Sequence, residues 1–223
     1  MANPGWVADN LGNEPYGINS VLTKDADYFH ELQTQTGWGR TLYSFAEWCT
    51  PQPGWLTLDV GCGPGLLAAI LAKFGCRAVG VDLDPQMFQP TPVYNNIALA
   101  DVNALPFESK SFDFVTASNL LFLLPQPILA LIEMRRILKP GGKVALLNPS
   151  EKLNVIAAAS FAEERGLEGL ARDTLLNWAR RAEENHRWTE DETRTLYSNA
   201  SLRYKAGALK VGPGFGRFSW GTI

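Results

Sequence analysis

The hydrophobic residues of this chain change their spacing at about residue 55. From there on, short continuous apolar runs alternate with longer segments in which apolar residues recur every three or four positions. Continuous runs predict buried strands, and the longer period predicts amphipathic helices. Strands are therefore expected at 56–60, 77–81, 96–100, 112–117 and 143–147, and helices at 64–74 and 127–138. The breaker cluster Lys139-Pro-Gly-Gly142 is expected to end the second helix and to precede the fifth strand.

Strands that alternate with helices through short connections predict a parallel sheet with right-handed crossovers. This alternation stops after Pro149. Residues 153–188 show a helical period, whose apolar stripe (Leu167, Leu170, Leu175, Trp178, Ala182) we interpret as packing. The sequence from Thr189 to Glu192 has the form of a helix cap, and that helix is expected to run to about residue 199. Two last strands, 202–211 and 215–223, predict a terminal hairpin.

We therefore divide one domain, 1–223, into four parts. They are an N-terminal lid or cap segment (1–50, with a helix expected at 41–48), a core (55–149), a helical insertion (150–188), and a final helix with its hairpin (189–223).

Composition narrows the function. A net charge of −3 and a pI of about 5.5 show no basic field for nucleic acid, so no nucleic-acid partner is expected. Cys49, Cys62 and Cys76 lack disulfide or zinc-ligand spacing, which favours a reducing compartment and predicts no metal site. No signal peptide and no apolar run of about 20 residues is visible, so the expectation is a cytoplasmic protein without a membrane partner.

The most informative segment is Leu58-Asp-Val-Gly-Cys-Gly-Pro-Gly65. A strand ending in an acid enters a turn with glycine at alternate positions, where a ligand can lie against bare backbone beside a helix N-terminus. A dinucleotide site is the nearest alternative. Its third glycine would come one residue later, at Leu66, and the carboxylate of Asp59 would repel a pyrophosphate. A ligand with an amino group and no phosphate fits this turn better.

With these residues, the chain resembles class I S-adenosylmethionine-dependent methyltransferases of the small-molecule group. The resemblance covers about 56–149 and resumes from 189 to the end. Its landmarks are 59–65, 79–87, 100–102, 105–107, 112–115 and 138–142. It implies an α/β fold: a Rossmann-like, doubly wound, seven-stranded, mostly parallel sheet with a C-terminal antiparallel hairpin and helical lid segments.

The resemblance also implies the cofactor, S-adenosylmethionine, with S-adenosylhomocysteine as product, and a set of binding residues. Asp59 would lie near the methionine amino group, and Gly61, Cys62 and Gly63 would line that end. Asp82 would accept hydrogen bonds from both ribose hydroxyls, as a carboxylate does in dinucleotide folds. A turn-capping role for Asp59 and a plain surface role for Asp82 remain alternatives.

The adenine and acceptor ends are implied in the same way. Leu83 would cover one adenine face, Asp101 would accept from the adenine amino group, and Val102 would offer its backbone N–H. Ser118 and Asn119 would lie where cofactor and acceptor meet. Asp101 as an ordinary loop acid remains an alternative.

There are two departures from the family pattern. Prolines at 85, 90 and 92 leave room for barely one helical turn where the family has a full helix. The Asn/Asp-Pro-Pro-aromatic box of nucleobase-amine methylating members is also absent after residue 117, which argues against nucleobase acceptors.

The predicted function is methyl transfer to a small-molecule acceptor by in-line displacement. This chemistry requires no particular catalytic residue, and none is assigned. The alternatives are a non-catalytic cofactor-binding protein of the same fold, and an aminopropyl transferase, for which acids near Ser118 are missing. Segments 1–50 and 150–188 are expected to form the acceptor site. Candidate contributors there are Tyr16, Tyr28, Trp38 and the histidines His30 and His186, while Arg40 would reach the carboxylate of the cofactor. The sequence does not indicate the acceptor or the oligomeric state.

Overall fold

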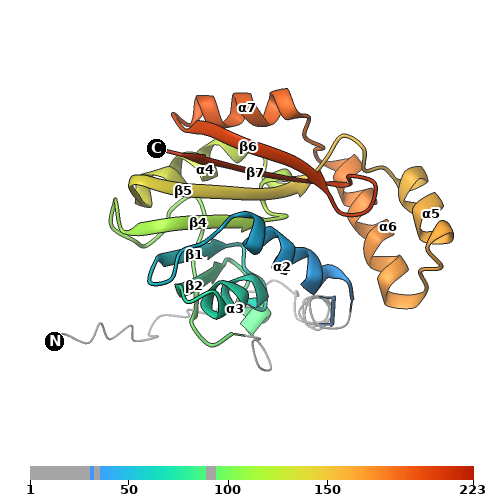
Figure 1. Cartoon of the computed structure of the whole chain (residues 1–223), viewed down its shortest axis with the longest axis horizontal. Helices are drawn as coiled ribbons and strands as arrows, with labels where there is room; N and C mark the ends of the chain where they lie inside the picture. The colour runs from blue at the N-terminus through green and yellow to red at the C-terminus, as the bar shows by residue number, and fades with distance from the viewer. Residues whose placement is uncertain (1–30, 33–35, 89–93) are drawn as a thin grey trace, which may run out of the picture.

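A computed structural model describes residues 31–32, 36–88 and 94–223. Within them lies one seven-stranded sheet of order β3-β2-β1-β4-β5-β7-β6. The first five strands pair in parallel, and β7 runs antiparallel to both β5 and β6. The sheet and its terminal hairpin confirm the predicted fold class (Figure 1). The strands are β1 Leu56–Val60, β2 Arg77–Asp82, β3 Ile97–Leu99, β4 Phe112–Ser118, β5 Leu138–Pro149, β6 Arg203–Lys210 and β7 Gly216–Thr222.

Helices cover both faces of this sheet, as alternation of the strand side chains requires. The described helices are α2 Trp38–Trp48, α3 Leu66–Lys73, α4 Pro127–Ile137, α5 Val155–Glu164, α6 Gly169–Glu184 and α7 Glu190–Asn199, with 3₁₀ turns η1 Pro85–Phe88 and η2 Leu121–Leu123. Phe114 of β4 packs in one core cluster with residues of α2 and α3. The next residue, Val115, packs in the other cluster with residues of α4 and α7.

Two predicted boundaries within the core were wrong. The helix expected at 64–74 begins at Leu66, because Gly65 adopts φ 92° and Pro64 stands before the cap. The fifth strand begins at Leu138, not at 143, and it includes the expected breaker cluster. In the pairing with β4, Leu138 lies opposite Phe112, and the next paired residues are Lys143 and Phe114. β5 therefore has more residues between these two pairs than β4 has. The cluster is therefore a wide irregularity within the strand, with Gly141 at φ 75°.

The insertion forms two helices where the sequence predicted one helical stretch. α5 ends at Glu164, Gly166 adopts φ 59°, and α6 starts at Gly169. Both helices lie beyond the carboxyl ends of β4 and β5 (Figure 1). The predicted cap of α7 is confirmed as a reciprocal capping box between Thr189 and Glu192. No helix among the described residues is both long and apolar enough to cross a membrane.

Candidate functional site

The site lies where the parallel strands β1, β2 and β4 end at one edge of the sheet, with β1 between the other two. The chain order reverses across β1, and ligands of open α/β sheets bind in the crevice at such a point. Asp59 lies near the end of β1, Asp82 is the last residue of β2, and Ser118 is the last residue of β4. The topology therefore brings together three polar positions that are far apart in the sequence.

The glycine turn after β1 is held against β2 by the backbone. The N–H groups of Gly61 and Cys62 both donate to the carbonyl of Val81, at 2.8 and 3.0 Å. Gly61 and Gly63 adopt φ 69° and 53°, in the left-handed region that favours glycine. A Cβ at Gly61 would lie 3.1 Å from the side chain of Leu120. The turn thus presents bare backbone that a larger residue would obstruct.

Asp59 is a buried carboxylate with one side-chain donor. It is 2% exposed, and the hydroxyl of Thr116 donates to its Oδ1 at 2.8 Å. Burial raises its pKa to about 7, against the lowering by Thr116, and the nearby charge of Asp82 raises it further. No lysine or arginine among the described residues forms an ion pair with Asp59. The carboxylate is therefore suited to a cationic ligand group.

Asp82 links the glycine turn to the loop after β2. Its Oδ2 accepts from the backbone N–H of Gly63 at 2.8 Å, and its Oδ1 accepts from that of Asp84 at 3.1 Å. Burial raises the pKa of Asp82, and these backbone hydrogen bonds lower it. Each carboxylate oxygen can accept more than one hydrogen bond, so both remain able to accept from a ligand.

Asn119 connects the end of β4 to the insertion. It adopts φ 54°, and its backbone N–H donates to the carbonyl of Leu147 at 2.7 Å. Its side-chain Oδ1 accepts from the indole N–H of Trp178 on α6, at 3.0 Å. The ring of Trp178 also meets that of Trp38 on α2, edge to face, with 5.4 Å between centroids. The two expected lid segments therefore meet above the ends of the strands.

Residues of these elements line an open cavity of about 1580 Å³. Seven of the ten residues predicted to bind the cofactor line it: Asp59, Gly61, Cys62, Gly63, Asp82, Ser118 and Asn119. The structure thus brings most of the predicted site to one cavity. What these residues bind remains a prediction.

The three residues assigned to the adenine end do not line this cavity. Leu83 is 67% exposed, and Val102 packs in the core that includes α4. Asp101 is exposed, and its Oδ1 accepts from the backbone and side chain of Asn103, at 2.8 and 3.0 Å. Their assigned roles stay predictions.

Sequence reasoning missed part of the lining contributed by α6. The apolar stripe interpreted as packing has a second role, because Leu167, Leu175 and Trp178 of that stripe face the cavity. Arg180 and Arg181 also line it and were not singled out. A helical period shows that one face is covered, but it does not show whether protein or ligand covers it.

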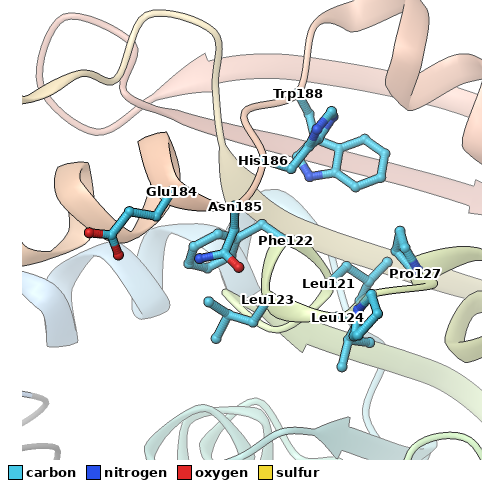
Figure 2. Close-up of a pocket in the computed structure, with 10 residues that line it drawn as sticks. Leu121, Phe122, Leu123, Leu124, Pro127, Glu184, Asn185, His186 and Trp188 are labelled. Atoms are coloured by element: carbon cyan, nitrogen blue, oxygen red, sulfur yellow. The ribbon is translucent and has the colours of Figure 1, made fainter.

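The remaining candidates, including Arg40 for the cofactor carboxylate, fall in different places. Trp38 and Arg40 line the cavity, whereas Tyr16, Tyr28 and His30 lie outside the described residues. His186 lines a second, smaller cavity of about 410 Å³, between η2, the start of α4 and the α6–α7 connection (Figure 2). The indole N–H of Trp188 in that cavity has no hydrogen-bond partner among the described residues. Phe122 and Leu123 line both cavities and separate them.

Among the described residues, no group of three or more histidine, cysteine, aspartate or glutamate side chains is arranged to hold a metal ion. Burial raises the pKa of the Cys62 thiol, and the nearby carboxylates of Asp59 and Asp82 raise it further. Cys62 therefore contributes a neutral thiol to the turn, not a thiolate nucleophile.

Comparison with known proteins adds a family to this geometry. Residues 58–146 match the family described as "Methyltransferase domain". A ribosomal protein L11 methyltransferase of Burkholderia mallei is 34% identical over 148 residues, which cover 63% of this chain and 47% of that protein. The chain spans less than half the length of the curated relatives it matches.

Solved structures show the same fold. A structure of the complex between the Haloferax volcanii Trm112 methyltransferase activator and a methyltransferase contains a similar chain, with a TM-score of 0.68 and 18% identity, covering 91% of this chain and 97% of that one. A SAM-dependent methyltransferase from Aquifex aeolicus gives a TM-score of 0.61 at 16% identity, covering 90% and 98%. At such identities the likeness is one of fold.

Proposed function

Since residues 58–146 are a methyltransferase domain and the chain has the class I, S-adenosylmethionine-dependent methyltransferase fold, we propose that this protein transfers a methyl group from S-adenosylmethionine to a small-molecule acceptor. The observation that supports this most is the single cavity that joins the glycine turn, the buried carboxylate of Asp59 and the half-buried carboxylate of Asp82 to a lid made by α2 and α6.

The residues at the ends of the strands fit the cofactor chemically. Asp59 is a buried carboxylate without a cationic partner among the described residues, and an amino-acid ammonium group would supply one. Asp82 has two oxygens with remaining acceptor capacity, which suits a vicinal diol. The turn at Gly61 leaves space that a Cβ would fill.

When bound, the cofactor supplies an electrophilic methyl group on a positively charged sulfur. The protein has to hold the acceptor in line with that methyl group and keep water out, because a good leaving group needs little further activation. In our proposal the glycine turn and Asp59 fix the amino-acid end, and Asp82 fixes the ribose. Trp38 and Trp178 close the cavity from the lid side.

A macromolecular acceptor is the second candidate, and the ribosomal protein L11 methyltransferase among the relatives favours it. The lid favours a small molecule, because Trp38 of α2 and Trp178 of α6 meet in ring contact above the strand ends and so narrow the access of a bulky acceptor. A non-catalytic, cofactor-binding protein is the third reading, and it predicts binding without turnover.

Binding and transfer are tested in sequence. Thermal unfolding is measured with S-adenosylmethionine, S-adenosylhomocysteine or NAD, and we expect the first two alone to raise the melting temperature. Methyl-labelled cofactor is then incubated with a metabolite extract and, separately, with a protein extract. Label in low-mass products supports the proposal, and label only in protein supports the second candidate. Stabilisation by NAD alone would overturn the cofactor assignment.

A further inference from the structure

We propose that the acceptor is a small organic anion with a flat apolar body, whose negative group is received by arginines of the lid. This inference rests on the proposed function, since it names the substrate class of the same cavity. It is carried by the distribution of charge on α6 and α2.

Some of the positively charged residues of α6 line the cavity, and none of its negatively charged residues does. The helix carries Arg172, Asp173, Arg180, Arg181, Glu183 and Glu184. Of these six, only Arg180 and Arg181 line the cavity. On α2, Arg40 lines it as well, and Glu47 does not. The described part of the lid thus presents only positive charge to the cavity, although the helices themselves are mixed.

These lid arginines are not used by the protein's own carboxylates. Arg180 donates to the side-chain carbonyl of Asn177 at 2.8 Å, which is a neutral partner. Neither Arg40 nor Arg181 forms an ion pair within the described residues. Arg217, by contrast, pairs with two glutamates. A ligand carboxylate or phosphate would give these exposed lid arginines charged partners at the opening of the cavity.

The cavity has room for a second ligand beside the cofactor. Its volume of about 1580 Å³ exceeds the roughly 1,000 Å³ at the upper end of ordinary ligand pockets. The two acids that line it, Asp59 and Asp82, lie at the strand ends, where the cofactor is proposed to bind. The arginines belong to the lid and lie on different elements. The negative groups that line the cavity therefore come from the strand ends, and the positive groups come from the lid helices.

The walls on the lid side select a flat apolar body. Trp38, Phe161, Leu167, Leu175 and Trp178 line this part of the cavity. Aromatic rings and leucine side chains favour an apolar or aromatic surface, and guanidinium groups beside them hold its carboxylate or phosphate. The same arrangement disfavours cationic acceptors such as amines, because the described part of the lid offers no carboxylate to a positive charge in the cavity.

The probe for this proposal is benzoate, with benzamide as its neutral counterpart. Protein loaded with S-adenosylhomocysteine is titrated with each, and the indole N–H signals of Trp38 and Trp178 are followed by NMR. We expect benzoate to shift these signals saturably and to bind at least tenfold more tightly than benzamide. Equal affinity of the two probes would overturn the proposal.

Variants on one helix provide the matched comparison. Arg181→Gln and Arg180→Gln remove cavity-lining charges, and Arg172→Gln removes a charge from the same helix that does not line the cavity. We expect the first two to weaken benzoate binding several-fold, Arg181→Lys to restore part of it, and Arg172→Gln to leave it unchanged. If Arg172→Gln weakens it as much as Arg181→Gln, the effect is one of net charge and the proposal fails.

A separate measurement tests the proposed function itself. S-adenosylhomocysteine binding to each variant is measured by calorimetry, and we expect it to be unchanged by substitutions of Arg180 and Arg181. Lack of binding by the unaltered protein contradicts the proposed function, whatever benzoate does. With labelled cofactor, the metabolite extract is first separated on an anion exchanger at pH 8. Acceptor activity in the retained fraction supports an anionic acceptor, and activity confined to the unretained fraction contradicts it.

Discussion

At the scale of single residues, the site depends on two carboxylates that the fold places in unequal surroundings. Asp59 is almost fully buried and has one side-chain donor, the hydroxyl of Thr116. Asp82 accepts from two backbone N–H groups, those of Gly63 and Asp84. Burial raises both pKa values, that of Asp59 to about 7. The charge of Asp59 therefore changes near neutral pH.

The raised pKa of Asp59 predicts a pH-dependent stability. Between pH 3.8 and about 7 the folded protein keeps a proton that the unfolded chain has released, so stability falls as pH rises through this range. We expect Asp59→Asn to remove this slope and to stabilise the ligand-free protein at pH 8 by about 2–4 kcal/mol, while the difference is small at pH 4. Urea unfolding at the two pH values measures this.

Ligand binding gives the control for Asp59. An ammonium group beside it favours the ionised carboxylate, so S-adenosylhomocysteine should bind more tightly as pH rises from 6 to 8, and more weakly to Asp59→Asn throughout. A variant that binds as tightly as the unaltered protein, with the same pH dependence, would contradict the assignment of the amino-acid end.

Substitution of Asp82 is also expected to weaken cofactor binding, but for a different reason from that of Asp59. Asp82→Ala removes the acceptor for a ribose diol and also the acceptor for the N–H of Gly63. We expect S-adenosylhomocysteine binding to weaken by about 2 kcal/mol, or roughly 30-fold, in calorimetry. Asp173→Ala, which removes an exposed acid of α6, is the matched control and should have no effect. An unchanged dissociation constant for Asp82→Ala would refute the ribose role.

At the scale of elements, apolar periodicity located every described strand and most helices, since all of them except β3 have residues in, or packed against, one of two core clusters. It failed where glycine decides the backbone. Gly166 separates α5 from α6, and Gly141 allows an irregularity within β5 in place of a break. Neither outcome follows from hydrophobic spacing, because a glycine at positive φ can end a helix or widen a strand equally well.

Substitution of Trp178 tests how far the local stability of α6 depends on its hydrogen bond to the end of β4. Trp178→Phe keeps an aromatic ring against Trp38 and removes the N–H that donates to Asn119. We expect a cost of about 1 kcal/mol, seen as roughly fivefold faster amide exchange confined to α5 and α6. Trp38→Phe keeps the donor to Asn119 and should leave exchange in α6 nearly unchanged. Equal effects of both variants would mean that the hydrogen bond does not hold the lid.

At the scale of the whole molecule, the site is assembled from strand ends that sequence motifs mark and from a lid that they do not. The glycine turn and the strand-end acids could be predicted, because short strands fix where they lie. Arg180 and Arg181 could not, because whether they line the same cavity as Asp82 depends on how the insertion folds back over the sheet. Thus the strand-end lining of the cavity was predictable from local sequence, whereas the α6 residues that line it required the tertiary structure.

Backbone hydrogen bonds join the two ends of the insertion (residues 150–188), which form its base, to each other and to the sheet. The backbone N–H of Trp188 donates to the carbonyl of Pro149 at 3.0 Å, and that of Ser150 donates to the carbonyl of Phe215 at 2.8 Å. Arg217 of β7 lies at this base and is almost fully buried. It donates to the carbonyl of Trp188 at 3.1 Å and pairs with Glu151 at 2.8 Å. The two ends of the lid are thereby joined to the sheet.

We therefore expect substitution of Arg217 to lower the stability of the whole fold. It also pairs with Glu190, at the start of α7, and Arg194 pairs with the same glutamate at 2.9 Å from a more exposed position. We expect Arg217→Met to destabilise the protein by about 3 kcal/mol in urea unfolding, because it removes a buried guanidinium together with its hydrogen bond to Trp188 and its two ion pairs. Arg194→Met should cost less than about 1 kcal/mol, since its ion pair is solvent-exposed. If both cost the same, burial of Arg217 contributes nothing, and the base of the lid is held by its backbone hydrogen bonds alone.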